Sequence, residues 1–170
     1  MCNSILLNFL HCEFFSYKLK FLITIINIKS FCVFLFMDWR TEFYEARWHL
    51  DVAKRMLKSY DEYSEKRILV GVIREAAKAV GNLVRAFLIR ERVKGNLDTF
   101  VGEVGPKFLD VVMIGELVKM LEIERDQRKS RVEFTKGNKI LMEVGGRWKI
   151  LEVVRLKEII KVIGDVVSGF

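Results

Sequence analysis

Apolar residues recur at alternating steps of four and three from position 39 onward, which is the spacing of one face of an α-helix. Asp38 stands just before this pattern, where its carboxylate can accept hydrogen bonds from the free amides of a first helical turn. We therefore predict a first helix that starts after Asp38 and packs through one stripe. The stripe comprises Trp39, Phe43, Ala46, Leu50, Ala53, Leu57 and Tyr60.

The same spacing predicts a second helix over residues 65–93. Its apolar face is wide, which is typical of a helix at the centre of a bundle. The connection over residues 61–64 is short, so we expect the first two helices to form an antiparallel hairpin. The apolar face comprises Leu69, Val72, Ile73, Ala76, Ala77, Val80, Leu83, Val84, Phe87 and Leu88.

Glycines and Pro106 interrupt the pattern over residues 94–108, and proline suits the first turn of a new helix. We predict a third helix over residues 107–128 and a last helix over residues 155–167. The third helix has a looser stripe, formed by Phe108, Val112, Leu117, Leu121 and Glu124. The last helix carries Leu156, Ile159, Ile160, Ile163, Val166 and Val167.

Between Val132 and Val153 the apolar period changes from that of a helix to the two-residue period of a strand. Gly145 and Gly146 supply the positive φ angles of a tight hairpin. A two-residue loop would pair Met142 with Lys149, and Val144 with Arg147, which mixes polar and apolar residues on both faces. We therefore predict a three-residue loop over residues 145–147. That register places Glu143 opposite Lys149 and groups Ile140, Met142, Val144, Trp148 and Ile150 on one face.

Together these elements predict a mostly α protein. Its architecture is an antiparallel helical bundle of about four helices, with one small β-hairpin before the last helix. The bundle is expected over residues 37–170, and the hairpin over residues 138–153.

Residues 1–36 differ in composition from the rest of the chain. They contain no Gly, Ala, Pro, Arg or Asp, yet they hold all three Cys. The apolar run over residues 21–36 is shorter than the about 20 residues of a membrane span and contains Lys29. Three interpretations stay open: an upstream extension with Met37 as the true start, a membrane anchor, and a helix packed on the bundle. The first predicts a cytoplasmic protein and the second a membrane-anchored one.

Catalytic chemistry is scarce in the predicted bundle. His49 is its one histidine and no cysteine follows Cys32, so no conventional zinc site can be assembled from it. The serines have no nucleophile motif around them. The sequence therefore predicts no cofactor, no metal and no catalytic residue, and a protein that is less expected to be an enzyme than a binding module.

The chain of 170 residues has a formal net charge of +7. Positive charge permits contact with phosphates but does not identify a partner. One basic cluster lies where the predicted third helix meets the hairpin, and it could serve either as helix-end charge or as a phosphate-binding site. This basic cluster comprises Arg125, Arg128, Lys129, Arg131, Lys136 and Lys139. Stacking aromatic residues are not expected beside it, so sequence-specific RNA reading has little support.

Several phrases of the chain resemble archaeal helical proteins related to the HEPN superfamily. These phrases are "EARWHLDVAKRMLKSYDEY", "KRILVGVIREAAKAVGNLVRAFLIRE" and "WKILEVVRLKEIIKVI". The resemblance implies a helical bundle that often dimerises, and that either cleaves RNA or accompanies a nucleotidyltransferase. Nuclease members carry an Arg followed after four to six residues by His, and neither Arg40 nor Arg47 has that spacing to His49. No catalytic residue is carried over.

Three functional hypotheses follow. The first is a noncatalytic helical interaction module that acts as a homodimer or with a protein partner. The second is an accessory protein that binds RNA or DNA through the basic cluster. The third is a membrane-tethered module, which requires residues 1–36 to be present and inserted.

Overall fold

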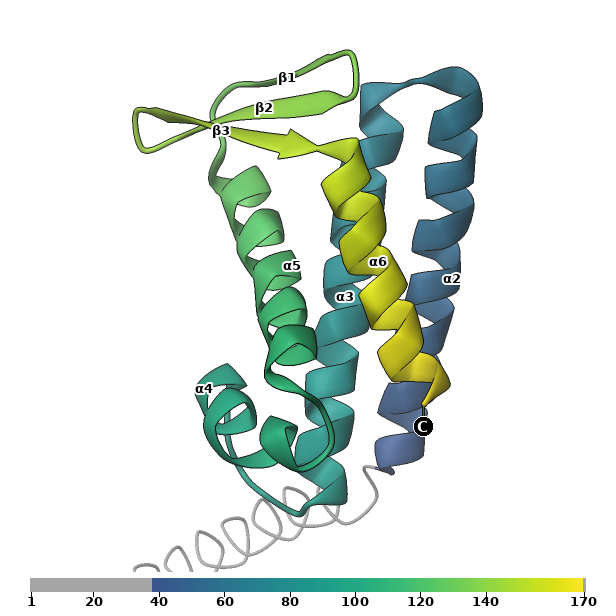
Figure 1. Cartoon of the computed structure of the whole chain (residues 1–170), viewed down its shortest axis with the longest axis vertical. Helices are drawn as coiled ribbons and strands as arrows, with labels where there is room; N and C mark the ends of the chain where they lie inside the picture. Colours follow the sequence, from purple (N-terminus) through teal and green to yellow (C-terminus); the bar gives the residue numbers. More distant parts are fainter. Residues whose placement is uncertain (1–37, 170) are drawn as a thin grey trace, which may run out of the picture. The chain divides into compact units, whose positions relative to one another are not determined.

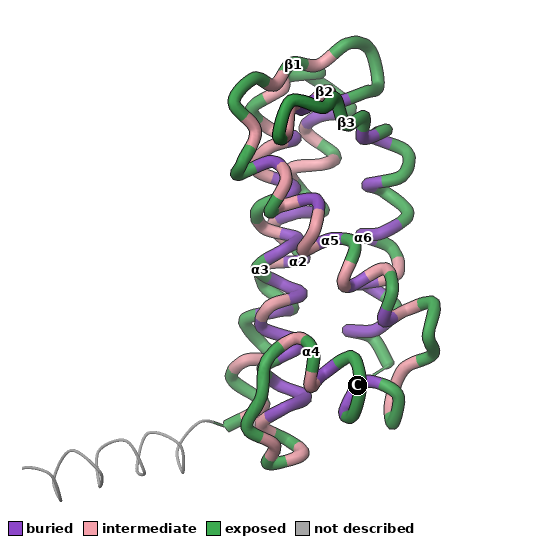
Figure 2. Tube along the Cα trace, turned by 90° about the vertical axis from the view of Figure 1, so that its left-hand side faces the viewer, coloured by how far each residue is buried: buried purple, intermediate pink, exposed green. Residues whose placement is uncertain are grey.

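The computed structural model describes residues 38–169, and the interpretations of residues 1–36 lie outside them. The described chain is mostly helical, with a small sheet before the last helix (Figure 1), which confirms the predicted fold class. Buried residues lie on the facing sides of the helices (Figure 2), so the core runs along the bundle.

Helices α2 (Trp39–Tyr63) and α3 (Lys66–Arg90) form the predicted hairpin. Asp38 caps α2, because its carboxylate accepts from the backbone N–H of Arg40 at 3.1 Å. Ser64 ends the helix in the left-handed conformation, with φ at 54°. Every residue of the predicted wide face of α3 is buried, which confirms its central place.

A compact turn region links α3 to the next long helix. Asn96 caps α4 (Leu97–Thr99), which continues into η1 (Phe100–Val104), a π-helical turn, and η2 (Gly105–Lys107), a 3₁₀ turn. Phe100 is fully buried, and its ring centroid lies 5.6 Å from that of Phe87. Pro106 belongs to η2, so it does not open the third long helix as predicted.

Helix α5 (Val111–Lys129) begins four residues later than predicted, after the N-cap Asp110. The predicted stripe is wrong at its start, since Val112 is 71% exposed. The stripe that faces the core runs instead through Ile114, Leu117, Met120, Ile123 and Gln127. Leu117 belongs to both stripes, and the shift follows from the late start because the turns before Asp110 have a different period.

The sheet is an antiparallel meander of β1 (Glu133–Lys136), β2 (Lys139–Val144) and β3 (Arg147–Glu152). The predicted register of the hairpin is wrong. Met142 pairs with Lys149, and Val144 with Arg147, so the loop contains two residues. Gly145 and Gly146 have φ angles of +60° and +77°, as a type I′ turn requires. Strand β1 was not predicted.

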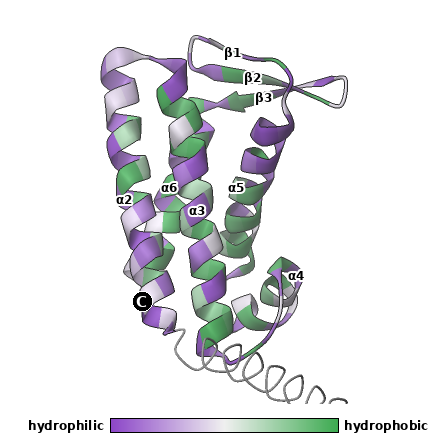
Figure 3. Ribbon diagram, turned by 180° about the vertical axis from the view of Figure 1, so that it is seen from behind, coloured by the Kyte–Doolittle hydropathy of each residue, from purple (hydrophilic) through white to green (hydrophobic). Residues whose placement is uncertain are grey.

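Helix α6 (Val153–Ser168) follows β3 directly and packs on α2 and α5. All six of its predicted apolar residues are buried, which confirms the stripe. Hydrophobic and hydrophilic residues share each strand of the sheet, whereas the helices turn hydrophobic residues inward (Figure 3). Within residues 38–169, no helix combines the length and hydropathy that crossing a membrane requires.

Candidate docking surface

The sheet has one face toward the core and one toward solvent. On the core side, Ile140, Met142 and Leu151 are buried, because β2 and β3 lie across the ends of α5 and α6. Since successive side chains alternate between faces, the intervening residues point outward. We call the side with Phe134, Leu141, Trp148 and Ile150 the outer face.

The outer face is unusually apolar for a solvent-facing surface. Phe134, Trp148 and Ile150 are 42%, 55% and 60% exposed. Phe134 and Ile150 both pair with Leu141, so these three side chains form one row across the strands, and Trp148 lies beside it, opposite Glu143. The rings of Phe134 and Trp148 meet edge to face, with centroids 5.5 Å apart and an interplanar angle of 69°. Side chains of this size that gather on one exposed face are typical of interaction surfaces.

Charged residues surround this apolar centre in equal numbers of each sign. Lys136 and Lys139 lie on the outer face with Glu143 and Glu152, as their pairing shows. The Lys139 Nζ is 3.0 Å from a Glu152 carboxylate oxygen. Glu143 accepts from the backbone N–H of Gly146 at 2.7 Å, which also closes the turn. The outer face therefore carries two cations and two carboxylates and has no excess of positive charge.

Polar contacts fix the sheet to the helices. Lys149 points to the core side and donates to Asp126 of α5 at 2.6 Å. Glu133 of β1 accepts from Gln127 at 3.1 Å and lies 3.5 Å from the Lys66 Nζ at the start of α3. These contacts explain the register, because a Lys on the core side has a carboxylate partner there. The outer face is therefore held on a rigid support.

The structure separates the members of the predicted basic cluster. Arg128 pairs with Glu124, one turn before it on α5, and Lys139 pairs with Glu152. Arg125 lines a groove of about 600 Å³ between α5 and β3. Arg131 precedes β1, where its N–H donates to the carbonyl of Glu143. Within residues 38–169, no ion pair involves Arg125, Lys129, Arg131 or Lys136.

The aromatic pair of the outer face was not predicted from the sequence. Phe134 lies within the stretch that holds the basic cluster, and Trp148 contacts it from β3, so aromatic residues do stand beside these cations. The signal that could have found them is the Gly145–Gly146 dipeptide, which favours a two-residue loop. That loop places Trp148 and Ile150 outward.

A polar network joins α2 and α3 along one side. His49 Nδ1 lies 2.6 Å from Glu75 Oε2, and Lys78 donates to Glu75 Oε1 at 2.7 Å. Burial acts to raise the pKa of the Glu75 carboxyl, but the hydrogen bonds and charges of Lys78 and His49 outweigh it, so the pKa is lowered. Buried Asn82 donates to Glu45 at 3.2 Å. We read this network as interhelical contact that fixes the hairpin.

The described residues offer no group of three or more His, Cys, Asp and Glu side chains arranged to hold a metal ion. Comparison of the chain with family models, with curated proteins and with solved structures gives no match in any of the three. The resemblance to the HEPN superfamily therefore stays a prediction.

Proposed function

We propose that residues 38–169 act as a noncatalytic interaction module that forms a homodimer through the outer face of the sheet. The observation that carries this proposal is the exposed group of Phe134, Trp148 and Ile150 on one face of the sheet. Fully burying one large apolar side chain contributes about 1.5–3 kcal/mol, and these three, which are about half exposed, can each gain about half of that in an interface. That gain offsets the cost of association only if the partner fits closely.

The charge pattern supports a second copy as the partner. In a twofold interface the same patch meets itself, so a cation can face a carboxylate only when the patch carries both. The outer face does, with Lys136 and Lys139 near Glu143 and Glu152. Because these charges balance, the outer face has little attraction for a polyanion. A protein surface is therefore a better partner than a nucleic acid here.

Two charge variants of the full chain test this proposal. K136E/K139E leaves four carboxylates on the outer face, and E143K/E152K leaves four cations there. Each variant alone should stay monomeric in sedimentation velocity, because like charges would meet across the twofold axis. An equimolar mixture should form a heterodimer. If each variant alone sediments as the unaltered chain does, or if the mixture stays monomeric, the proposed interface is wrong.

A second candidate function is nucleic-acid binding by the rest of the basic cluster. It is favoured by the absence of ion-pair partners for Arg125, Lys129, Arg131 and Lys136 among the described residues. In this case R125E/R131E should weaken binding of a single-stranded oligonucleotide and reduce its salt dependence. R55E/K58E, which changes the net charge equally on α2, is the control. This function would be contradicted if both variants lost oligonucleotide binding equally, or if the unaltered chain did not bind the oligonucleotide at low salt.

A further inference from the structure

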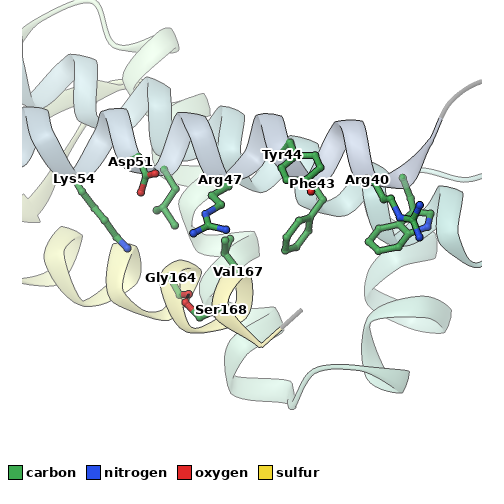
Figure 4. Close-up of a pocket in the computed structure, with 11 residues that line it drawn as sticks. Arg40, Phe43, Tyr44, Arg47, Asp51, Lys54, Gly164, Val167 and Ser168 are labelled. Carbon is green, nitrogen blue, oxygen red and sulfur yellow. Dashed lines mark hydrogen bonds between the residues drawn. The ribbon is translucent and has the colours of Figure 1, made fainter.

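A second surface lies at the other end of α6, away from the sheet (Figure 1). There α2 and the last turns of α6 enclose a groove of about 520 Å³, which we call the α2–α6 groove (Figure 4). Half-buried Phe43 lines it, together with the core residues Leu50 and Val167. Three cations of α2, namely Arg40, Arg47 and Lys54, line it as well.

These three cations are not paired with carboxylates in the described chain, as is also true of Arg55 and Lys58 on the same helix. Other lysines and arginines do lie within 4.0 Å of a carboxylate, as Lys149 and Lys157 do. No ion pair within residues 38–169 involves Arg40, Arg47 or Lys54. Asp51 is the one acidic residue among the groove-lining side chains. Even if Asp51 neutralised one cation, the groove would keep an excess of positive charge.

The position of Lys54 is fixed by α6. A Cβ atom at Gly164 would lie 3.1 Å from the Lys54 Nζ, so glycine leaves the space that the ammonium group occupies. The ammonium group also lies near the carboxyl end of α6, where partial negative charge attracts a cation. Arg47 likewise extends from α2 toward α6 (Figure 4). The groove therefore presents Arg47 and Lys54 toward α6, and Arg40 continues this row with its guanidinium over the Trp39 ring, 5.6 Å from the centroid.

The row has the repeat of a helix that packs on another helix. Arg40, Arg47 and Lys54 are seven residues apart, so successive Cα atoms are about 10 Å apart along α2. Half-buried Phe43 and exposed Tyr44 lie between Arg40 and Arg47, whereas Leu50 is only 1% exposed and belongs to the core. In coiled coils, charges that flank the packed stripe select a partner helix of opposite charge. A helix with an acidic residue at every seventh position would match each cation.

The occupant must come from another protein. Residues 1–37 contain a single acidic residue, Glu13, so they cannot supply the row. Among residues 38–169, no helix carries three acidic residues at seven-residue intervals, so a second copy of the bundle cannot match all three cations. We propose that the α2–α6 groove binds an acidic amphipathic helix of a different protein. This site does not depend on the dimer proposed above, since the groove and the sheet lie at opposite ends of α6.

The test uses the full chain and a synthetic helical peptide of about 18 residues, with Glu at every seventh position and Leu three residues after each Glu. Fluorescence anisotropy at low salt should detect binding. R47E/K54E should weaken it at least about tenfold, since two charge-assisted contacts are lost. R55E/K58E changes the net charge of α2 equally outside the groove and should bind as the unaltered chain does. Equal loss in both variants would overturn the proposal.

Two further probes make the result specific. A peptide with Lys in place of Glu should bind R47E/K54E more tightly than it binds the unaltered chain. Gly164→Leu, which adds no charge, should reduce binding of the Glu peptide by filling the space beside Lys54. A Gln-substituted peptide that binds equally well would overturn the proposal. So would tripolyphosphate or a single-stranded oligonucleotide that binds where the Glu peptide does not.

Discussion

The indole of Trp148 on β3 meets the ring of Phe134 on β1 edge to face, with the centroids 5.5 Å apart across the intervening strand β2. Both rings are on the solvent side of the sheet, 55% and 42% exposed. This contact shows that the outer face is one continuous apolar surface that spans three strands.

The two faces of the sheet should respond differently to truncation. Ile140 is fully buried on the core side, whereas Ile150 is 60% exposed on the outer face. We expect Ile140→Ala to lower the free energy of unfolding by about 2–5 kcal/mol, because it leaves a cavity. Ile150→Ala should change it by about 0.5 kcal/mol or less. Urea unfolding of both variants, kept dilute enough to be monomeric, checks this prediction. Similar losses in both would mean that the sheet register is wrong.

The two-residue turn of the hairpin should depend on its glycines. Gly146 has φ at +77°, so Gly146→Ala should destabilise the fold by about 1–2 kcal/mol. Gly115 provides the matched control, because it lies inside α5 with nothing within 4 Å of an added Cβ. Gly115→Ala should stabilise the fold by about 0.5–1 kcal/mol. Thermal unfolding of the two variants should show shifts of opposite sign. A Gly146→Ala variant as stable as the unaltered chain would contradict the positive φ angle of Gly146 in this turn.

The polar network between α2 and α3 predicts a dependence on pH. The pKa of Glu75 is lowered below its ordinary value of 4.5 in the folded chain. Its ionised form therefore contributes stability above pH 4.5, and that contribution is lost as the pH falls through the lower folded value. The unaltered chain should exceed Glu75→Gln in stability near neutral pH, and the difference should shrink in acid. Urea unfolding at several pH values measures it. A difference that stays constant or grows in acid would contradict the assignment.

Much of the fold could be predicted because the helices bury long, regular stripes. The stripes of α2, α3 and α6 have the period of a helix throughout, and local sequence determines them. The start of α5 could not be found in the same way. Three short turns with different periods precede it, and their geometry depends on the burial of Phe100 against Phe87. An apolar stripe extrapolated through these turns therefore falls on the wrong face of α5.

The hairpin register and the candidate surface depended on tertiary contacts. The predicted register assumed that apolar residues face the core and polar residues face solvent, so it placed Lys149 outward. In the structure Lys149 lies on the core side, because Asp126 of α5 accepts a hydrogen bond from it there. Strand β1 is short, and its inward residue Glu133 is polar because Gln127 and Lys66 meet it there. The basic cluster could be identified because its residues lie close together in the sequence. Which of them form ion pairs depends on the neighbours that α5 and the sheet provide, Glu124 for Arg128 and Glu152 for Lys139.

The most direct test of the proposed dimer is the mass of the full chain with one exposed tryptophan replaced. Trp148 on the outer face and Trp48 on α2 are 55% and 61% exposed, so they form a matched pair. Trp148→Glu places a charge in the proposed interface, and Trp48→Glu places the same charge elsewhere. In sedimentation equilibrium, the unaltered chain and Trp48→Glu should give the mass of a dimer, and Trp148→Glu that of a monomer. A dimeric Trp148→Glu variant, or a monomeric unaltered chain, would contradict the account.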